Sequence, residues 1–168
     1  QMDQIASGAK YRQSKLLFIN QGDGTFCNAS TQGGAALSEL RVSRGAAFGD
    51  LDNDGDIDIV VEELDSTPMI LTNEGEKANH WITLELAAKQ GNPLAVGARI
   101  KVTTGKVVQT EEIRSGTSYL SQNDLRVHFG LGKAAKVDSI EIRWNSGKVE
   151  TIKDVAADKF YAVLEGEG

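Results

Sequence analysis

One short segment of the chain concentrates carboxylates at a regular spacing. The stretch GDLDNDGDID, residues 49–58, contains five aspartates with one residue between successive members: Asp50, Asp52, Asp54, Asp56 and Asp58. No lysine or arginine between Ala46 and Met69 balances them. Two carboxylates about 4 Å apart repel each other by about 1 kcal/mol even in water, and by more where solvent is reduced. A bound cation would offset this repulsion.

The spacing of the aspartates also limits the fold of the loop. Counted from Asp50, Gly55 occupies the sixth position, where it permits a sharp turn, and Asp58 occupies the ninth. A helical calcium hand begins in the same way, but its twelfth position is a glutamate and its loop leads into a helix. Here the twelfth position is Val61, and the residues after the loop have strand character. A helical hand is therefore a poor fit.

We predict instead a loop between two strands that folds around one Ca²⁺. The expected ligands are the side chains of four aspartates and the main-chain carbonyl of a fifth: Asp50, Asp52, Asp54 and Asp58, with the carbonyl of Asp56. Ca²⁺ accepts six to eight oxygen ligands in flexible geometry, whereas Mg²⁺ requires a tighter octahedron and retains more water. The alternative interpretation is an acidic surface hairpin that binds no ion.

The remaining polar residues do not suggest catalysis. A nucleophile needs a base within reach, and the only histidines, His80 and His128, adjoin large aromatic residues in strand-like segments. The acid pairs Glu62-Glu63 and Glu111-Glu112 are sequence neighbours, so in a strand their side chains point to opposite faces and cannot flank one glycosidic bond. We predict that the chain is not an enzyme.

A second candidate binding segment is rich in hydroxyl and amide groups. Residues 116–122, GTSYLSQ, surround one tyrosine with such groups. Tyr119 can stack on a sugar while Ser121 and Gln122 hydrogen-bond to it, which makes these three residues candidate ligand-binding residues. The competing interpretation is a packing loop between two sheets.

Alternating apolar residues indicate strands nearly throughout the chain. The alternation covers residues 57–61, 82–86, 100–103 and 140–144. A period of two is typical of half-buried strands. Turn residues separate these segments, and we expect tight hairpins at Ser115-Gly116 and at residues 145–147. The fold class is predicted to be all-β.

Composition limits the classes of partner. Residues 1–79 carry 13 acidic and 6 basic side chains, whereas residues 80–168 carry 11 acidic and 12 basic ones, which places a domain boundary near residue 79. No basic cluster offers a surface for nucleic acid. No apolar run approaches the roughly 18 residues of a membrane span. The lone Cys27 excludes an internal disulfide, and we expect it to be buried or half-buried.

An internal repeat supports the same boundary. The segment LLFINQG, residues 16–22, aligns with MILTNEG, residues 69–75, at an offset of 53 residues. Periods of 40 to 50 residues are typical of β-propeller blades, each a small sheet of about four strands. The chain begins at Gln1 without a basic and then apolar leader, so either a signal peptide has been removed or the chain is a piece of a longer protein, and we expect the piece.

The quoted motifs resemble two known families. The stretch RGAAFGDLDNDGDID, residues 44–58, resembles the FG-GAP (VCBS) repeat of integrin-type β-propellers, and NQGDGTF, residues 20–26, resembles the turn that closes the preceding repeat. From His80 to about Gly166 the chain resembles the ASPIC/UnbV domain, through HWI, VGARI, GTSYLSQ, HFGLG and RWNSG. Asn145 departs from the proline that is more frequent in that family.

These resemblances imply a partial β-propeller of about one blade with a calcium loop, residues 1–79, joined to a small antiparallel β-sandwich, residues 80–168. They imply a secreted, periplasmic or cell-surface module for adhesion or interaction, in which Ca²⁺ stabilises the blade. The alternative is a carbohydrate-recognising sandwich that is accessory to a larger secreted protein. Because a blade cut from its array leaves an apolar face uncovered, formed by Ile57, Ile59, Val61 and Ile70, we expect this piece to form a homodimer.

Overall fold

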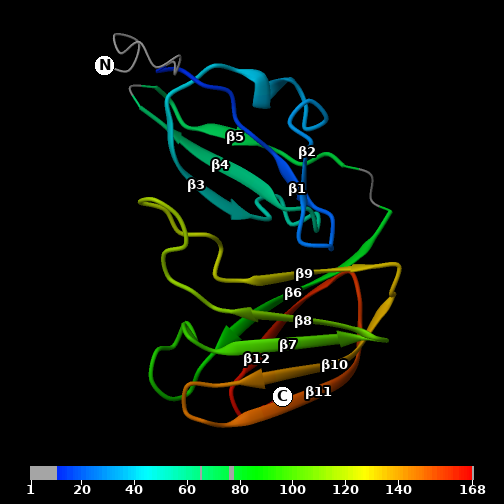
Figure 1. The fold of residues 1–168 in the computed structure, drawn as a ribbon. Coiled ribbons are helices and arrows are strands. Elements are labelled where there is room, and N and C mark those ends of the chain that lie inside the picture. Colours follow the sequence, from blue (N-terminus) through cyan, green and yellow to red (C-terminus); the bar gives the residue numbers. More distant parts are fainter. Residues whose placement is uncertain (1–10, 65, 76–77, 168) are drawn as a thin grey trace. The chain divides into compact units, whose positions relative to one another are not determined.

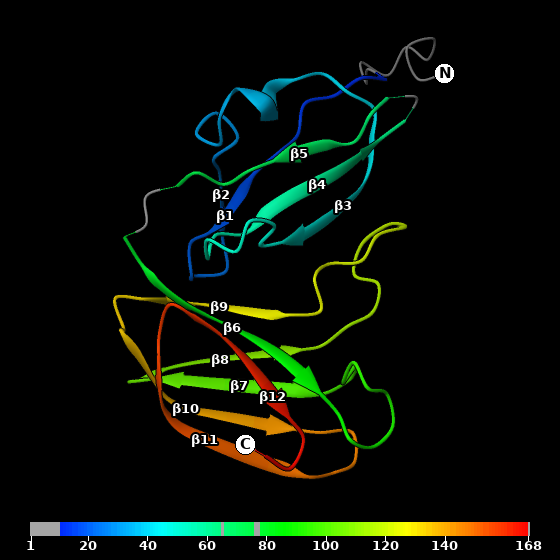
Figure 2. The same ribbon diagram turned by 180° about the vertical axis from the view of Figure 1, so that it is seen from behind.

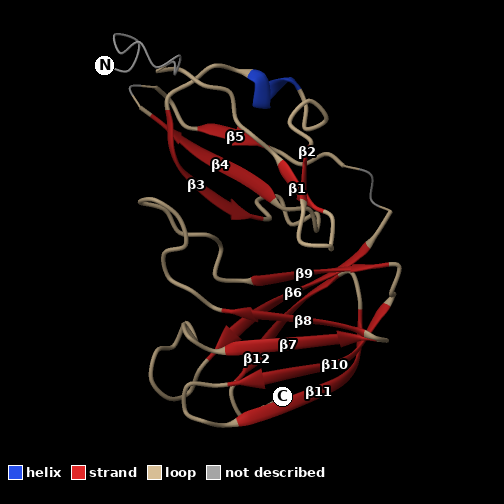
Figure 3. Cartoon of the chain, viewed as in Figure 1, coloured by secondary structure: helices blue, strands red, loops and turns tan. Residues whose placement is uncertain are grey.

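Strands make up nearly all of the regular structure. The computed structural model describes residues 11–64, 66–75 and 78–167, and the helical element among them is one short 3-10 turn at Ala35–Ser38. Figure 3 shows this turn in a chain otherwise built from strands and loops. Within the described residues, no helix has the length and hydropathy that a membrane crossing needs. The all-β fold class is confirmed.

The first strands form a hairpin and a three-stranded sheet (Figure 1). Strands β1 (Phe18–Asn20) and β2 (Phe26–Asn28) pair in antiparallel fashion. The sheet has the order β3-β4-β5, formed by β3 (Ser43–Gly49), β4 (Asp58–Glu63) and β5 (Met69–Leu71). The loop that contains the aspartates therefore joins two strands, β3 and β4, that are neighbours in one sheet.

The internal repeat is reproduced in the local hydrogen bonding. The Gly22 N–H donates to Oδ1 of Asn20 at 2.8 Å, and the Gly75 N–H donates to Oδ1 of Asn73 at 3.1 Å. Each asparagine thus closes a turn on its own backbone two residues later, which is the reason that asparagine and glycine recur at this spacing.

The second half of the chain forms two sheets in two layers (Figures 1 and 2). Their strands are β6 (His80–Ala87), β7 (Arg99–Thr104), β8 (Val107–Glu112), β9 (Val127–Gly132), β10 (Lys136–Arg143), β11 (Val149–Ala156) and β12 (Lys159–Leu164). One sheet has the order β11-β10-β7-β8 and the other β12-β6-β9. Strand β12 runs parallel to β6, and the other neighbouring strands of these two sheets pair in antiparallel fashion.

A single apolar core lies between the two sheets. Inward-facing residues of both sheets are almost fully buried: Ile82, Leu84, Phe129, Ile100, Val102, Ile140, Ile142 and Trp144. Along β7 and β10 they alternate with half-buried or exposed residues, as strands with one buried face require, whereas in β6 the Thr83 between Ile82 and Leu84 is also buried. The fold expected for this half, a small sandwich, follows from this alternation.

Three local expectations are wrong. Ser115-Gly116 does not close a tight hairpin, because β8 pairs with β7 and β9 pairs with β6. Cys27 is exposed and lies in the two-stranded β1–β2 hairpin. Val61 is buried, so among the four apolar residues expected on an uncovered sheet face only Ile70 is strongly exposed, at 63%.

The contacts divide the chain into two compact units. One unit combines Val60–Leu71 with the chain up to Ala46, and the other combines Ala47–Ile59 with the chain from Thr72 onward. The loop with the aspartates thus belongs to the same unit as the β-sandwich. The domain boundary near residue 79 stays a prediction.

Candidate metal centre

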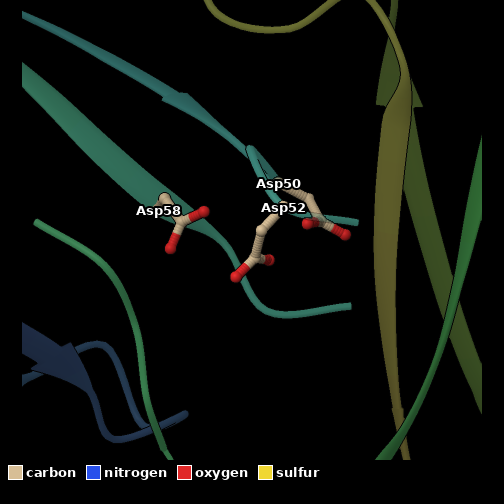
Figure 4. A group of neighbouring side chains, drawn as sticks. All are labelled: Asp50, Asp52 and Asp58. Atoms are coloured by element: carbon tan, nitrogen blue, oxygen red, sulfur yellow. The ribbon is translucent and has the colours of Figure 1, made fainter. Parts of the chain in front are cut away.

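Three of the five aspartates bring their carboxylates together. Asp50 directly follows β3, Asp52 lies in the loop, and Asp58 opens β4 (Figure 4). One carboxylate oxygen of each lies within 4.8 Å of the others. Asp50 and Asp58 are buried, with exposures of 3% and 2%, whereas Asp52 is exposed. A cation at this group would be bound by two buried carboxylates, and it would be open to solvent on the side where Asp52 lies.

Backbone N–H groups of the loop hold these carboxylates in place. The two oxygens of Asp50 accept hydrogen bonds from the N–H groups of Asp54 and Gly55, at 3.1 and 2.9 Å. Asp58 accepts from the Leu51 N–H at 2.9 Å and from the Asn73 N–H at 2.8 Å. An ionised carboxylate has about four acceptor sites, so these bonds fix its orientation and leave lone pairs for a cation.

The same chemistry shapes the tip of the loop. The Asp54 N–H donates to Oδ1 of Asp52 at 3.2 Å, and the Asp56 N–H donates to Oδ1 of Asp54 at 2.9 Å. Each aspartate side chain bonds to the backbone two residues later, which is an Asx turn. The alternate aspartates therefore have two roles. Their side chains close the turns of the loop, and three of them bring their carboxylates together.

Asp54 and Asp56 lie outside the group of three. The Asp54 side chain accepts the N–H bond just described. Oδ2 of Asp56 is buried and has no hydrogen-bond partner among the described residues. A buried carboxylate oxygen without a partner is costly, and a bound cation would satisfy it. The residues present therefore fit a cation such as Ca²⁺, which accepts carboxylate oxygens in flexible geometry.

Two loop residues adopt left-handed backbone conformations. Asn53 has a φ of 61° and Gly55 a φ of 95°. Gly55 is buried against the indole of Trp81, which leaves no room for a Cβ atom. The glycine at the sixth position is thus required by both the turn and the close approach of Trp81.

The carboxylates also act on a nearby histidine. Burial lowers the pKa of His128, while the negative charges of Asp50 and Asp56 act in the opposite direction. Nδ1 of His128 lies 3.1 Å from Oγ1 of Thr83. The other histidine, His80, bonds through Nδ1 to Asp158 at 2.6 Å. Both histidines thus have partners within the sandwich strands and turns.

The second candidate segment lies in the connection between β8 and β9. Ser118 and Ser121 form an isolated bridge that makes a tight turn, with Tyr119 at its tip. Tyr119 is 63% exposed and Gln122 is exposed, whereas Ser121 is half-buried. This arrangement does not bury the tyrosine ring in a packing loop, which was the competing interpretation.

The sequence did not point to three residues beside the aspartate loop. Arg126 donates hydrogen bonds to Asp50 and Asn53 of the loop, and Asn123 and Asp124 bond to the backbone of Phe48, near the end of β3. They lie about 70 residues further along the chain, and no spacing rule connects them with the aspartates. Only the placement of the residues before β9 beside the loop identifies them.

Comparisons with known proteins match both parts of the chain. A family model described as FG-GAP-like repeat matches residues 2–61, and one described as ASPIC and UnbV matches residues 88–168. Cartilage acidic protein 1 of Homo sapiens is 30% identical over 137 residues, which are 79% of this chain and 20% of that protein. Cartilage acidic protein 1 of Xenopus tropicalis is 32% identical over 126 residues, which are 72% of this chain and 19% of that protein. The chain spans about a fifth of the length of these relatives.

Proposed function

We propose that this chain, which joins an FG-GAP-like repeat to an ASPIC and UnbV domain, is a non-catalytic extracellular interaction module stabilised by calcium. One observation carries the calcium assignment: oxygens of Asp50, Asp52 and Asp58 lie within 4.8 Å of one another at the join of two neighbouring strands. The unpartnered Oδ2 of Asp56 supports it.

The role of the ion would be structural. Ca²⁺ supplies positive charge that offsets the repulsion between the carboxylates. Asp50, Asp52 and Asp58 would hold it with their side chains, and Asp54 and Asp56 are the remaining proposed ligands. Because Asp50 follows β3 and Asp58 opens β4, an ion held by both would fix the ends of these strands relative to each other.

The absence of catalysis and the extracellular location are parts of the same proposal. His80 and His128 are bonded to Asp158 and Thr83, and these contacts support a structural role for each histidine. Glu62 is exposed and Glu63 is buried, so this acid pair does not converge on one substrate. Secretion, or display on a cell surface or in a periplasm, fits a calcium-stabilised module, since free calcium is plentiful in such compartments.

Calorimetric titration of the chelator-treated chain with CaCl₂ tests the proposal. We expect uptake of one ion and a melting temperature that rises with calcium, because only the folded loop binds it. At a free concentration of about 100 times Kd, the gain in unfolding free energy would be about 2.7 kcal/mol. The double variant D52N/D54N should lose the uptake, whereas Asp154→Asn, which changes an exposed carboxylate paired with Lys136, should retain it. No uptake by the unmodified chain would overturn the assignment.

A second candidate function is carbohydrate recognition by the sandwich. It is favoured by the exposed ring of Tyr119, with Ser121 and Gln122 following it, because a stacking platform must face solvent. A glycan array tests this candidate. Consistent sugar binding that is lost in Tyr119→Ala and retained in D52N/D54N would favour it, whereas an empty array would reject it.

A further inference from the structure

Arg126 reaches the aspartate loop with both ends of its guanidinium group. Its Nη2 donates to the main-chain carbonyl of Asp50 at 2.8 Å, and its Nη1 donates to Oδ1 of Asn53 at 2.7 Å. Arg126 immediately precedes β9 and lies within the ASPIC and UnbV match, whereas Asp50 and Asn53 lie within the FG-GAP match. One side chain from the segment that matches ASPIC and UnbV thus bonds to two residues of the aspartate loop, which lies in the segment that matches the FG-GAP-like repeat.

A second set of bonds fixes the segment that carries Arg126. The Asp124 N–H donates to the Phe48 carbonyl at 2.9 Å, and the Phe48 N–H donates to Oδ1 of Asn123 at 3.2 Å. Phe48 lies two residues before Asp50, near the end of β3. The guanidinium also lies over the ring of Phe160, 5.3 Å from its centroid. Arg126 is therefore held in one place on the sandwich while its donors point at the loop.

The charge of Arg126 is balanced locally. Its Nε donates to Oδ2 of Asp124 at 2.6 Å, and the Arg126 N–H donates to Oδ1 of the same carboxylate at 2.9 Å. A guanidinium without such a partner would repel a cation in the loop. With Asp124 beside it, Arg126 acts on the loop through directed hydrogen bonds.

We propose that Arg126 is the positioning residue of the metal loop and couples ion binding to the packing of that loop on the sandwich. By bonding to the Asp50 carbonyl and to Asn53, it fixes the backbone from which the Asp50 and Asp52 carboxylates project. The inference rests on the proposed calcium function. Coupling is reciprocal: if this packing raises calcium affinity, calcium must strengthen the packing by the same factor.

Calcium titration of the full chain with Arg126→Ala and Arg126→Lys tests the inference. Replacement of a residue that orients metal ligands commonly costs 10- to 100-fold in affinity, so we expect the Kd of both variants to rise at least tenfold. Lysine keeps the positive charge but lacks the planar fork, so it should not rescue affinity. Arg99→Ala is the matched control, because Arg99 is an exposed arginine whose guanidinium pairs with Glu112, a residue outside the aspartate loop.

A second measurement separates positioning from a general loss of stability. Hydrogen exchange at the Asp124 amide, which donates to Phe48, reports on the packing of the loop. Calcium should slow this exchange in the unmodified chain and in Arg99→Ala, but not in Arg126→Ala. An unchanged Kd in both Arg126 variants, or rescue by lysine, would overturn the inference alone. No calcium uptake by the unmodified chain would overturn the proposed function as well.

Discussion

Trp81 lies directly against Gly55, so closely that a Cβ atom built on Gly55 would stand 2.0 Å from Nε1 of the indole. Trp81 in turn stacks on His128, with ring centroids 5.9 Å apart, and forms an edge-to-face pair with Phe160, with ring centroids 4.9 Å apart. The indole therefore cannot move aside without disturbing other aromatic rings. The turn of the aspartate loop is thus fitted to one residue at the start of the sandwich.

Gly55→Ala should therefore be strongly destabilising. The substitution combines a left-handed backbone, with a φ of 95°, and a steric clash with Trp81. Strain of this kind and overpacking together cost about 3 kcal/mol. Gly91→Ala is the control, because Gly91 has a φ of 81° but no atom within 4 Å of its Cβ position, so it should cost only about 1 kcal/mol. Chemical denaturation of both variants measures the difference, and equal losses would contradict the fit described above.

Asp58 and Asp52 should behave differently when they are replaced. Asp58→Ala removes the acceptor of the Leu51 and Asn73 N–H groups, and each unsatisfied group costs about 1–3 kcal/mol. Its variant should melt at a lower temperature even without calcium. Asp52 is exposed, so Asp52→Asn should weaken calcium binding and leave the calcium-free melting temperature nearly unchanged. Calorimetry with and without chelator checks both outcomes, and a stable calcium-free Asp58→Ala would contradict this role of Asp58.

The stability of the sandwich should fall in acid, partly because of Glu150. A hydrogen bond from the Lys148 side chain holds the pKa of Glu150 below its ordinary value of 4.5, helped by the backbone N–H of Gly166 and the indole N–H of Trp144, although burial acts in the opposite direction. A depressed folded pKa contributes stability above pH 4.5, and this stability is lost as the pH falls through the folded value. Glu150→Gln should flatten the decline of melting temperature below about pH 4.5. If the melting temperature of Glu150→Gln falls in acid as steeply as that of the unmodified chain, Glu150 does not contribute to the acid sensitivity.

Self-association should depend on the β1–β2 hairpin. Phe26 in β2 is 63% exposed and Phe18 in β1 is 52% exposed. Monomers rarely expose large apolar patches, so we expect a dimer by light scattering at tens of micromolar. Phe26→Asp should shift it to monomer. Leu94→Asp, at a comparable exposure of 57% in the sandwich unit, should not. A monomeric unmodified chain would contradict the expected homodimer.

The sequence by itself determined the strands and the chemistry of the loop. Period-two alternation depends only on the two faces of a strand, so it located β4, β6, β7 and β10 without knowledge of their partners. The alternate aspartates and Gly55 define a local turn, because each Asx bond spans only two residues. The family models cover the quoted motifs of both families except HWI, residues 80–82, which lies before the ASPIC and UnbV match begins at residue 88.

Only the tertiary structure decided which parts pack together. Strand β8 pairs with β7, and β9 pairs with β6, which is why Ser115-Gly116 does not close a hairpin. Burial of Val61 and exposure of Cys27 likewise depend on which strands are covered. The bonds from Arg126 to Asp50 and Asn53 join residues more than 70 positions apart. Contacts between residues so far apart in the sequence depend on the packing of the whole unit. They produce no periodic pattern from which the sequence could have predicted them.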